Sequence, residues 1–173
     1  QGIPVALATK EAMVYGGRLA RELMDRTGTP VLPLDSEISA IFQCLQGNHK
    51  AQAEEILLTA SGGPFRTWPL EKIQKATLKQ ALQHPNWSMG AKITIDSASM
   101  ANKGLEIMET RWMFDIDPAK ITVVVHPESI VHSAVRYADG CVMAQLGATD
   151  MKLPIAYALR YPQRLPNCGE RLD

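Results

Sequence analysis

The feature that most constrains the fold is a change in how strand-like and helical patterns follow one another. Early in the chain, short apolar runs alternate with helical periodicity, an order typical of strands joined by helices. Near the end, Ser133–Tyr137 and Cys141–Leu146 flank Ala138-Asp139-Gly140, whose Asp-Gly is a strong hairpin signal. The sequence therefore predicts an α+β domain with a mixed β-sheet and helices packed mainly on one face.

The expected elements can be read from these patterns. The predicted strands are Ile3–Ala8, Pro30–Leu34, Glu55–Ala60, Lys92–Asp96, Ile121–His126 and the hairpin pair. Helical periodicity covers Glu11–Thr27, Glu37–Leu45, Asn102–Phe114 and Met151–Tyr161, with weaker patterns at Pro69–Ala76 and Thr77–Gln83. The segment HPNWSMGA, which follows Gln83, predicts a loop, and loops that carry Trp and Met are often lids.

Composition excludes several classes of protein. The 173 residues are 46% hydrophobic and 21% charged, with no net charge, so we expect a globular protein that binds neither nucleic acid nor membrane. No apolar run approaches the roughly 20 residues of a membrane span. Cys44, Cys141 and Cys168 fit neither a disulfide framework nor a CxxC metal site, which favours a cytoplasmic location. The chain begins at Gln1 and ends in LPNCGERLD, and we expect it to be part of a longer protein.

The stretch LPLDSEISAIFQ places Asp35 and Glu37 on either side of Ser36, where an apolar run gives way to a helical pattern. Like charges this close raise a pKa or require a cation. In one interpretation Asp35 or Ser36 is an N-cap for a helix that starts at about Glu37. In the other, the carboxylates belong to a metal or catalytic site.

Two further polar clusters follow predicted strands, where open α/β sheets usually bind ligands. Ser61-Gly62-Gly63 follows the strand that ends at Ala60, and its glycines would let backbone N–H groups approach an anion. A plain turn has the same pattern. After the first strand, Lys10 is either a solvated surface lysine or a group that reaches an anionic or carbonyl oxygen in a cleft.

The segment IDSASMANKGLEIME predicts a phosphate site at a helix N-terminus. Ser97 is expected to end a strand, while Asn102 and Lys103 open the helix that carries Glu106. Spacings of three and four residues place Asn102, Lys103 and Glu106 on one helix face. A capping residue with a surface Lys–Glu pair is the alternative. Glu106 beside a phosphate is explained if a divalent cation also binds there.

Asp35, Glu37 and Glu106 together would supply three hard oxygen ligands. Such a set suits Mg²⁺ or Mn²⁺ and leaves coordination positions for substrate oxygens or water. The sequence has no His/Cys cluster at zinc spacing, which argues against zinc.

At this point a family resemblance becomes evident. LPLDSEISAIFQCL, LTASGGPFR, HPNWSMGAKITIDSASMANKGLEIMETRWMF and VHPESIVHSAVRYADGCVMAQLGATDMKLPIAYALRYP occur in that order between about Val5 and Pro162. They closely resemble the central region of the 1-deoxy-D-xylulose 5-phosphate reductoisomerase family.

The resemblance implies an activity. The family converts 1-deoxy-D-xylulose 5-phosphate and NADPH into 2-C-methyl-D-erythritol 4-phosphate, a step of non-mevalonate isoprenoid synthesis in the bacterial cytoplasm or the plastid stroma. Mn²⁺ or Mg²⁺ holds neighbouring sugar oxygens, the skeleton rearranges by retro-aldol cleavage and re-addition, and the resulting aldehyde takes hydride. Members are usually homodimers.

The resemblance also assigns residues. It places the metal and catalytic carboxylates at Asp35, Glu37 and Glu106, with Lys10 and Ser36 near the reacting carbons. The phosphate pocket falls on Ser61, Ser97, Asn102 and Lys103, with His84 beside it as a charged hydrogen-bond donor, and Trp87 covers the substrate from a flexible flap. The cofactor contacts correspond to Thr9, Glu11, Met89, Gly90 and Met151.

Three positions depart from the family pattern, and one expected part is missing. Thr9 stands where Asn is frequent, Ile38 where His is common, and Thr149 where Pro is frequent. The chain has no GxGxxG-type phosphate fingerprint. In the family an NADPH-binding domain precedes this region and a helical domain follows it. The resemblance therefore implies that residues 1–9 end the NADPH-binding domain, that 10–162 form the catalytic domain, and that 163–173 begin a linker to the helical domain. Such a segment alone is expected to bind metal without turning over.

Two other interpretations remain open. A non-catalytic module that binds a sugar phosphate or a metal would share the anion-binding residues, but a pure phosphate binder would not need the carboxylates. The hairpin VHPESIVHSAVRYADGCVMAQLG could be a dimer contact, and this would add to the enzyme interpretation. His126 and His132 in that segment are expected to be satisfied core or interface histidines.

Overall fold

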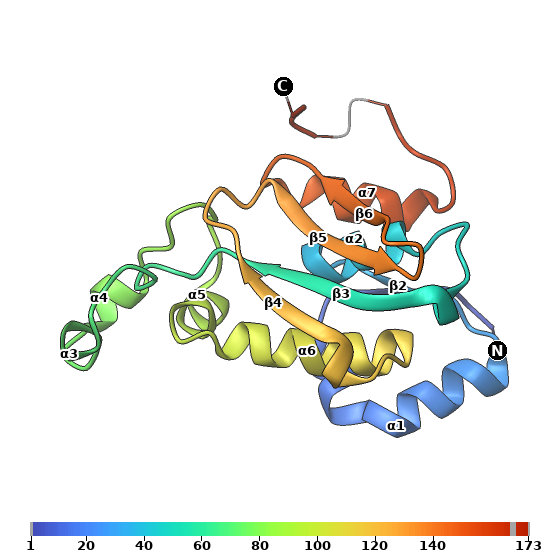
Figure 1. Ribbon diagram of the computed structural model, residues 1–173, viewed down its shortest axis with the longest axis horizontal. Coiled ribbons are helices and arrows are strands. Elements are labelled where there is room, and N and C mark those ends of the chain that lie inside the picture. Colours follow the sequence, from blue (N-terminus) through green and yellow to red (C-terminus); the bar gives the residue numbers. More distant parts are fainter. Residues whose placement is uncertain (1, 167–168, 173) are drawn as a thin grey trace.

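The fold is built on a four-stranded mixed sheet with a small parallel pair of strands beside it (Figure 1). A computed structural model describes residues 2–166 and 169–172. Within the main sheet the strand order is β4-β3-β5-β6, with bounds Ile121–Val125, Ala53–Ala60, Val131–Tyr137 and Val142–Leu146. Strand β3 pairs in parallel with β4 and antiparallel with β5, so the predicted mixed sheet and hairpin are confirmed.

The first two strands form a sheet of their own. Strands β1 (Val5–Leu7) and β2 (Val31–Pro33) pair in parallel, with Ala6 opposite Leu32. Helix α1 (Lys10–Thr27) connects them, as expected for a β-α-β unit. The helix kinks at Gly17, whose φ of +41° is unfavourable for residues with a side chain. A Cβ there would lie 3.2 Å from the Trp112 ring, so Gly17 lets α1 approach α6 closely.

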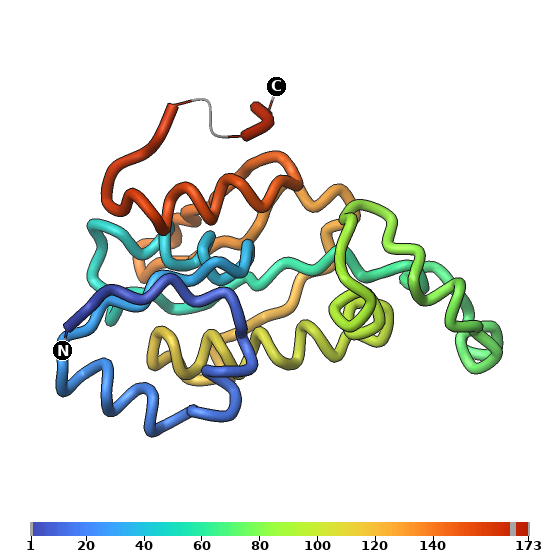
Figure 2. Tube along the Cα trace, turned by 180° about the vertical axis from the view of Figure 1, so that it is seen from behind, coloured from blue at the N-terminus to red at the C-terminus, as the bar shows by residue number. Residues whose placement is uncertain are grey.

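Helices α2 (Ser36–Cys44) and α6 (Ala101–Phe114) pack behind the sheet (Figures 1 and 2). Helix α1 packs against α6. The core between these layers includes Ile41 of α2, Leu58 of β3 and Val135 of β5, all fully buried. Helix α7 (Lys152–Arg160) follows the hairpin and lies near β2.

The remaining helices belong to a segment that extends away from the sheet. Short helices α3 (Leu70–Ile73) and α4 (Leu78–Ala81) lie in the projection at one end of Figure 1, and α5 (Ala91–Ala98) returns to the body. Two 3-10 turns, Lys50–Gln52 and Pro118–Lys120, precede β3 and β4. Among the described residues, no helix is both long and apolar enough to cross a membrane.

One predicted strand is wrong. Lys92–Asp96 lies inside helix α5, so Ser97 is in the last turn of a helix and does not end a strand. The alternation of Ile93, Thr94 and Ile95 suggested a strand, but only Thr94 is fully buried, and its hydroxyl donates to the Gly90 carbonyl at 2.8 Å. The Lys92–Asp96 ion pair at i,i+4 further favours the helix.

Three parts of the sequence-based prediction fall outside the described residues. Cys168 is one, so the structure assigns a state only to Cys44 and Cys141, which are free thiols. The others are Gln1 of the predicted domain end and positions 167–168 and 173 of the predicted linker.

Candidate active site

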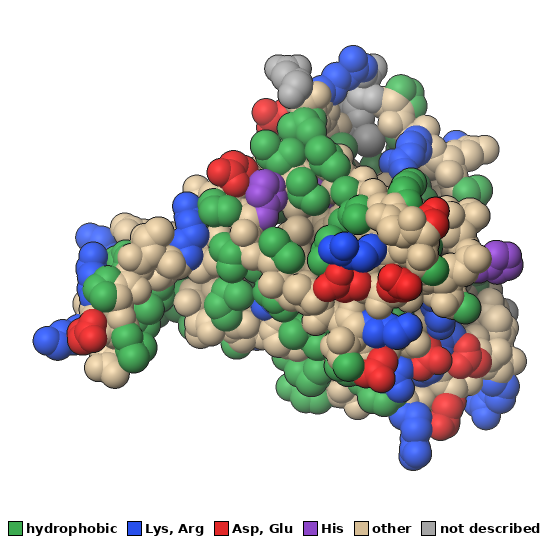
Figure 3. Space-filling view, in the orientation of Figure 1, with side chains coloured by type: hydrophobic (Ala, Val, Ile, Leu, Met, Phe, Trp, Pro, Cys, Tyr) green, Lys and Arg blue, Asp and Glu red, His purple; other side chains and the backbone are tan. Residues whose placement is uncertain are grey.

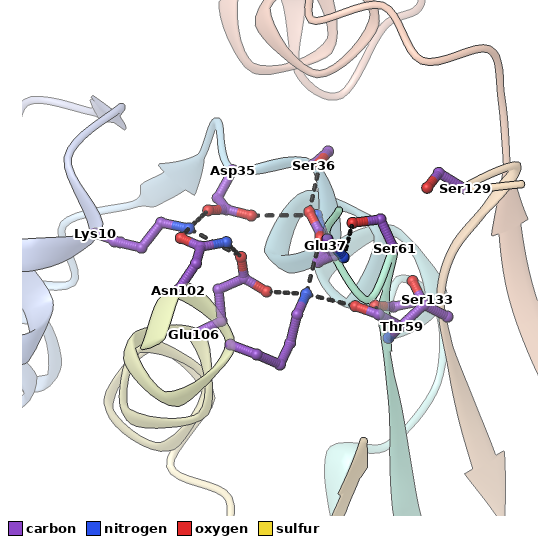
Figure 4. Close-up of polar contacts among 12 residues, drawn as sticks. Lys10, Asp35, Ser36, Glu37, Thr59, Ser61, Asn102, Glu106, Ser129 and Ser133 are labelled. Carbon is purple, nitrogen blue, oxygen red and sulfur yellow. Dashed lines mark hydrogen bonds and ion pairs between the residues drawn. The ribbon is translucent and has the colours of Figure 1, made fainter. Parts of the chain in front are cut away.

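Three carboxylates from two helices converge at the end of β2. Asp35 is the N-cap of α2 and accepts from the Glu37 backbone N–H at 3.3 Å, so the capping interpretation and the cluster interpretation both hold. Glu37 lies in the first turn of α2, and Glu106 projects from α6 (Figure 4). One oxygen of each carboxylate lies within 4.8 Å of the others. This spacing is compatible with a shared divalent cation.

Two lysines neutralise much of this charge. The Lys10 ammonium contacts the Asp35 carboxylate and donates to Glu106 Oε1 at 2.9 Å and Asn102 Oδ1 at 2.7 Å. The Lys103 ammonium donates to Glu37 Oε1 at 2.8 Å and also contacts the Glu106 carboxylate and the Thr59 carbonyl. Both lysines are buried, so water screens their positive charges little and their electrostatic attraction to the carboxylates is strong.

The cluster moves the pKa values of its members apart. Burial, with the Glu37 and Asp35 charges, raises the pKa of Glu106 to about 7 despite Lys103 and Lys10. The pKa of Glu37 is lowered to about 2. Burial on its own would raise it, but the Lys103 charge and the hydrogen bonds from Lys103 and Ser36 outweigh that effect. For Lys10 and Lys103, burial lowers the pKa and the neighbouring carboxylates more than reverse this effect, so both remain charged.

A cavity of about 270 Å³ opens beside the carboxylates. Most of the residues predicted for the site line it: Lys10, Asp35, Ser36, Glu37, His84, Trp87, Met89, Ser97, Asn102, Glu106 and Met151. The predicted loop between α4 and α5 contributes Trp87 and Met89 to the cavity wall. Ser61 and Lys103 do not line the cavity, and neither do Thr9, Glu11 and Gly90.

Ser61 is connected to the cavity by a hydrogen bond with His84, which lines it. The His84 Nδ1 accepts the backbone N–H groups of Asn86 and Trp87 at 3.2 and 3.0 Å, which leaves the ring proton on Nε2, 3.0 Å from Ser61 Oγ. Burial and the Arg66 charge lower the pKa of His84, although Glu37 opposes them. The predicted charged donor is therefore corrected: His84 is a neutral donor, because Nδ1 already accepts two hydrogen bonds.

The Ser61-Gly62-Gly63 loop lies directly against α5. Gly62 and Gly63 have φ values of +80° and +66°, and a Cβ on Gly63 would lie 2.7 Å from the Ser97 carbonyl oxygen. The Gly63 N–H donates to Ser61 Oγ at 3.2 Å. The glycines thus let the loop that carries Ser61 pack against Ser97, which lines the cavity, although the two segments are distant in the sequence.

Most of the residues predicted for cofactor contact lie at or next to the N-termini of α1 and α5, whereas Met151 is the N-cap of α7. Thr9 is the exposed N-cap of α1, and Gly90 is the N-cap of α5. Glu11 accepts from Lys92 at 2.5 Å, which joins these two helices. Met89 and Met151 are the members of this group that reach the cavity.

Comparison with known proteins identifies the family. Residues 31–114 match the family described as the 1-deoxy-D-xylulose 5-phosphate reductoisomerase C-terminal domain. The 1-deoxy-D-xylulose 5-phosphate reductoisomerases of Geotalea uraniireducens and Phocaeicola vulgatus are 59% and 57% identical over 99% of this chain. The chain belongs to this family. It spans less than half of these two relatives, 45% and 44% of their lengths.

Solved reductoisomerases share the fold over nearly the whole chain. One in complex with NADPH, fosmidomycin and magnesium superposes with a TM-score of 0.94 at 45% identity, covering 99% of this chain and 45% of that one. The Zymomonas mobilis enzyme in complex with NADPH gives 0.92 at 45% identity, covering 99% and 44%. The predicted resemblance and fold class are confirmed.

The reductoisomerase pattern did not predict every feature near the cluster. Glu109 is fully buried on α6, three residues after Glu106, and neither carboxylate oxygen has a hydrogen-bond partner within the described part of the chain. Its spacing from Glu106 was the available signal, because residues three apart share a helix face. The pairing of Lys103 with Glu37 was also missed, because it joins residues 66 positions apart.

Two departures from the family pattern remain unexplained, and one has a clear location. Ile38 is fully buried in the core, so it faces away from the cavity and leaves the carboxylates untouched. Nothing in the structure explains Thr9 or Thr149.

The two histidines of the hairpin segment are satisfied, as predicted. His126 Nε2 accepts the Ile130 N–H at 3.1 Å, and His132 Nε2 lies 3.3 Å from the Ala148 carbonyl. Neither belongs to the carboxylate cluster.

Proposed function

We propose that this chain is the catalytic segment of an NADPH- and divalent-metal-dependent reductoisomerase that converts 1-deoxy-D-xylulose 5-phosphate into 2-C-methyl-D-erythritol 4-phosphate. The observation that carries the proposal is the convergence of Asp35, Glu37 and Glu106 beside a cavity that Trp87 also lines. The relatives that are 59% and 57% identical to this chain bear the name of that enzyme.

The donor set fits a hard divalent ion. All three candidate ligands are carboxylates, no His or Cys belongs to the cluster within the described residues, and oxygen donors favour Mg²⁺ or Mn²⁺. When bound, the ion would polarise the oxygens of the sugar and stabilise developing negative charge. Lys10, which lines the cavity, would supply a second fixed positive charge on the same side.

The polar groups around Ser61 are proposed to hold the phosphate. Ser61, Ser97, Asn102 and His84 offer hydroxyl, amide and imidazole donors, and Lys103 lies behind them. The binding energy of the phosphate would position the sugar beside the carboxylates, without the phosphate itself taking part in the chemistry. Trp87 and Met89 would cover the sugar and exclude water when the flap closes.

The nicotinamide end of NADPH is proposed to lie beside Met89 and Met151. Thr9, Glu11 and Gly90 would extend this contact along the N-termini of α1 and α5. We propose that residues 1–9 end an NADPH-binding domain, that 10–162 form the catalytic domain, and that 163–173 begin a linker. The ADP part of NADPH would then be held by other parts of the protein.

We also propose a homodimer and a cytoplasmic location. The outer edge strands β4 and β6 expose apolar side chains, among them Val124, Val125, Val142 and Leu146. On the face shown in Figure 3, hydrophobic side chains are spread over the sheet, whereas acidic and basic ones gather over α1 and the part of β3 near it. A second copy would shield this apolar surface from water.

The test is a calorimetric Mn²⁺ titration of the full-length protein, with and without 1-deoxy-D-xylulose 5-phosphate. Wild-type protein is expected to bind Mn²⁺ more tightly when the sugar phosphate is present. Glu106→Gln should weaken Mn²⁺ binding by at least about tenfold, because a neutral amide replaces a charged ligand. Turnover, followed by NADPH absorbance, should fall in parallel.

Asp35→Asn separates the capping role from the ligand role. Asn is as good an N-cap as Asp, so the capping contribution to the free energy of unfolding should change by less than about 1 kcal/mol. Any larger loss of stability would come from the broken ion pair with Lys10. Mn²⁺ affinity should fall as it does in Glu106→Gln. Turnover that neither substitution lowers would contradict a metal-dependent enzyme. Sugar phosphate binding without turnover in the wild type would favour the non-catalytic module.

A further inference from the structure

Lys103 contacts the carboxylate cluster from behind and does not face the cavity. Its side chain is 6% exposed, and its ammonium group donates to Glu37 Oε1 at 2.8 Å while also contacting Glu106 and the Thr59 carbonyl. These three partners use all three of its N–H donors. In this arrangement Lys103 has no donor left for an anion in the cavity.

The partners of Lys103 are two of the three candidate metal ligands. Lys10 contacts Asp35 and Glu106, so the Glu106 carboxylate is shared between both ammonium groups (Figure 4). With every group ionised, the three carboxylates and two lysines carry a net charge of minus one. A divalent ion among the carboxylates would make this plus one if both ammonium groups kept their positions.

We infer that Lys103 competes with the divalent ion for Glu37 and Glu106, and that its ammonium group turns to the anionic end of the substrate when the ion binds. This inference rests on the proposed function, because it assumes a divalent ion at these carboxylates. A monovalent and a divalent cation a few ångströms apart in a buried site repel each other strongly. Lys103 relieves this repulsion by moving toward a new negative charge.

The residues proposed to hold the phosphate adjoin Lys103 and its partner Thr59 along the chain. Thr59, which accepts a hydrogen bond from Lys103, is two residues before Ser61, and Asn102 is adjacent to Lys103 in α6. A lysine side chain has four rotatable bonds, so its ammonium group can change partners while the stem stays in place. Binding of the metal and binding of a phosphate then become coupled, and each strengthens the other by the same factor.

The experiment compares wild-type full-length protein with Lys103→Met, which keeps the apolar stem and removes the charge. Free Mn²⁺ is measured by electron paramagnetic resonance, without substrate. Lys103→Met is expected to bind Mn²⁺ about tenfold more tightly, because the competing charge is gone. Mg²⁺ should strengthen the binding of inorganic phosphate severalfold in the wild type, and this effect should disappear in the variant.

The control is Lys79→Met, which removes one positive charge from the exposed surface of α4, away from the cluster. Both affinities should remain at the wild-type values. If circular dichroism shows that Lys103→Met is unfolded, Lys103→Gln replaces it, because the amide can still donate to the Thr59 carbonyl while the charge is absent.

Each outcome decides between the two proposals. Unchanged or weaker Mn²⁺ binding by the Lys103 variants, with a wild type that binds Mn²⁺, overturns the competition and leaves the proposed function intact. Lys103 would then hold the carboxylates in their binding geometry. A wild type that binds no Mn²⁺ overturns the inference and the metal-dependent function together.

Discussion

At the scale of single residues, the most unusual group is Glu109. Burial, with the charges of Asp35, Glu106 and Glu37, raises its pKa to about 9, although Lys10 opposes this. At neutral pH it is therefore protonated in the folded protein and ionised in the unfolded chain. Below the unfolded pKa of about 4.5, the carboxyl group is protonated in both states and does not oppose folding. As pH rises from there toward 9, only the unfolded chain ionises, so the free energy of unfolding falls.

Glu109→Gln should therefore gain stability relative to the wild type as pH increases. Gln titrates in neither state, so the difference in free energy of unfolding should grow by about 3 kcal/mol between pH 5 and pH 7.5. Urea denaturation at both pH values measures it. The control is Glu22→Gln, at a side chain 62% exposed, where the difference should stay constant. A flat difference for Glu109→Gln would mean that Glu109 is ionised in the fold.

At the scale of secondary-structure elements, the loop that follows β3 joins the sheet to α5. Gly63→Ala should destabilise the protein by about 2 kcal/mol, because its φ of +66° is strained for Ala and the new Cβ would lie 2.7 Å from the Ser97 carbonyl oxygen. Separation of the loop from α5 should also weaken the binding of inorganic phosphate. Thermal unfolding and calorimetry measure the two effects.

Gly104→Ala is the matched control for this prediction. Gly104 lies inside α6, and a Cβ added at this position would meet nothing within 4 Å, so Ala should stabilise the helix by about 0.5–1 kcal/mol. Equal stability of Gly63→Ala and the wild type would show that the loop and α5 can move apart at no cost.

The same scale shows what sequence can and cannot predict. Helical periodicity and the Asp-Gly signal were sufficient for α2, α6 and the hairpin, because each depends on nearby residues. Helix α5 was missed because its Ile-Thr-Ile alternation imitates a strand, and its Gly90 cap is a weak signal. The carboxylate cluster was predictable from residue types and spacing. The lysine pairings depend on how α2 packs against α6, which no local pattern encodes.

At the scale of the whole molecule, the outer face of the sheet is the proposed dimer surface. In the β5–β6 register Val142 lies opposite Arg136, so the two side chains share a face, and Val142 is 45% exposed. Strands β4 and β6 are the edges of the sheet, and exposed edges with apolar residues commonly pair with another chain. A homodimer through this surface would bury Val142 in each copy.

Val142→Lys should therefore shift the protein from dimer to monomer, because two lysines would be placed near each other in a desolvated interface. Sedimentation velocity at several concentrations measures the change, and the dissociation constant should rise by at least about a hundredfold. Leu159→Lys, at a side chain 70% exposed on α7, is the control and should leave the dimer intact. Dissociation by Leu159→Lys but not by Val142→Lys would move the interface from the sheet to α7. A wild type that is monomeric at all concentrations would remove the dimer proposal and leave the carboxylate site unaffected, since all three carboxylates come from one chain.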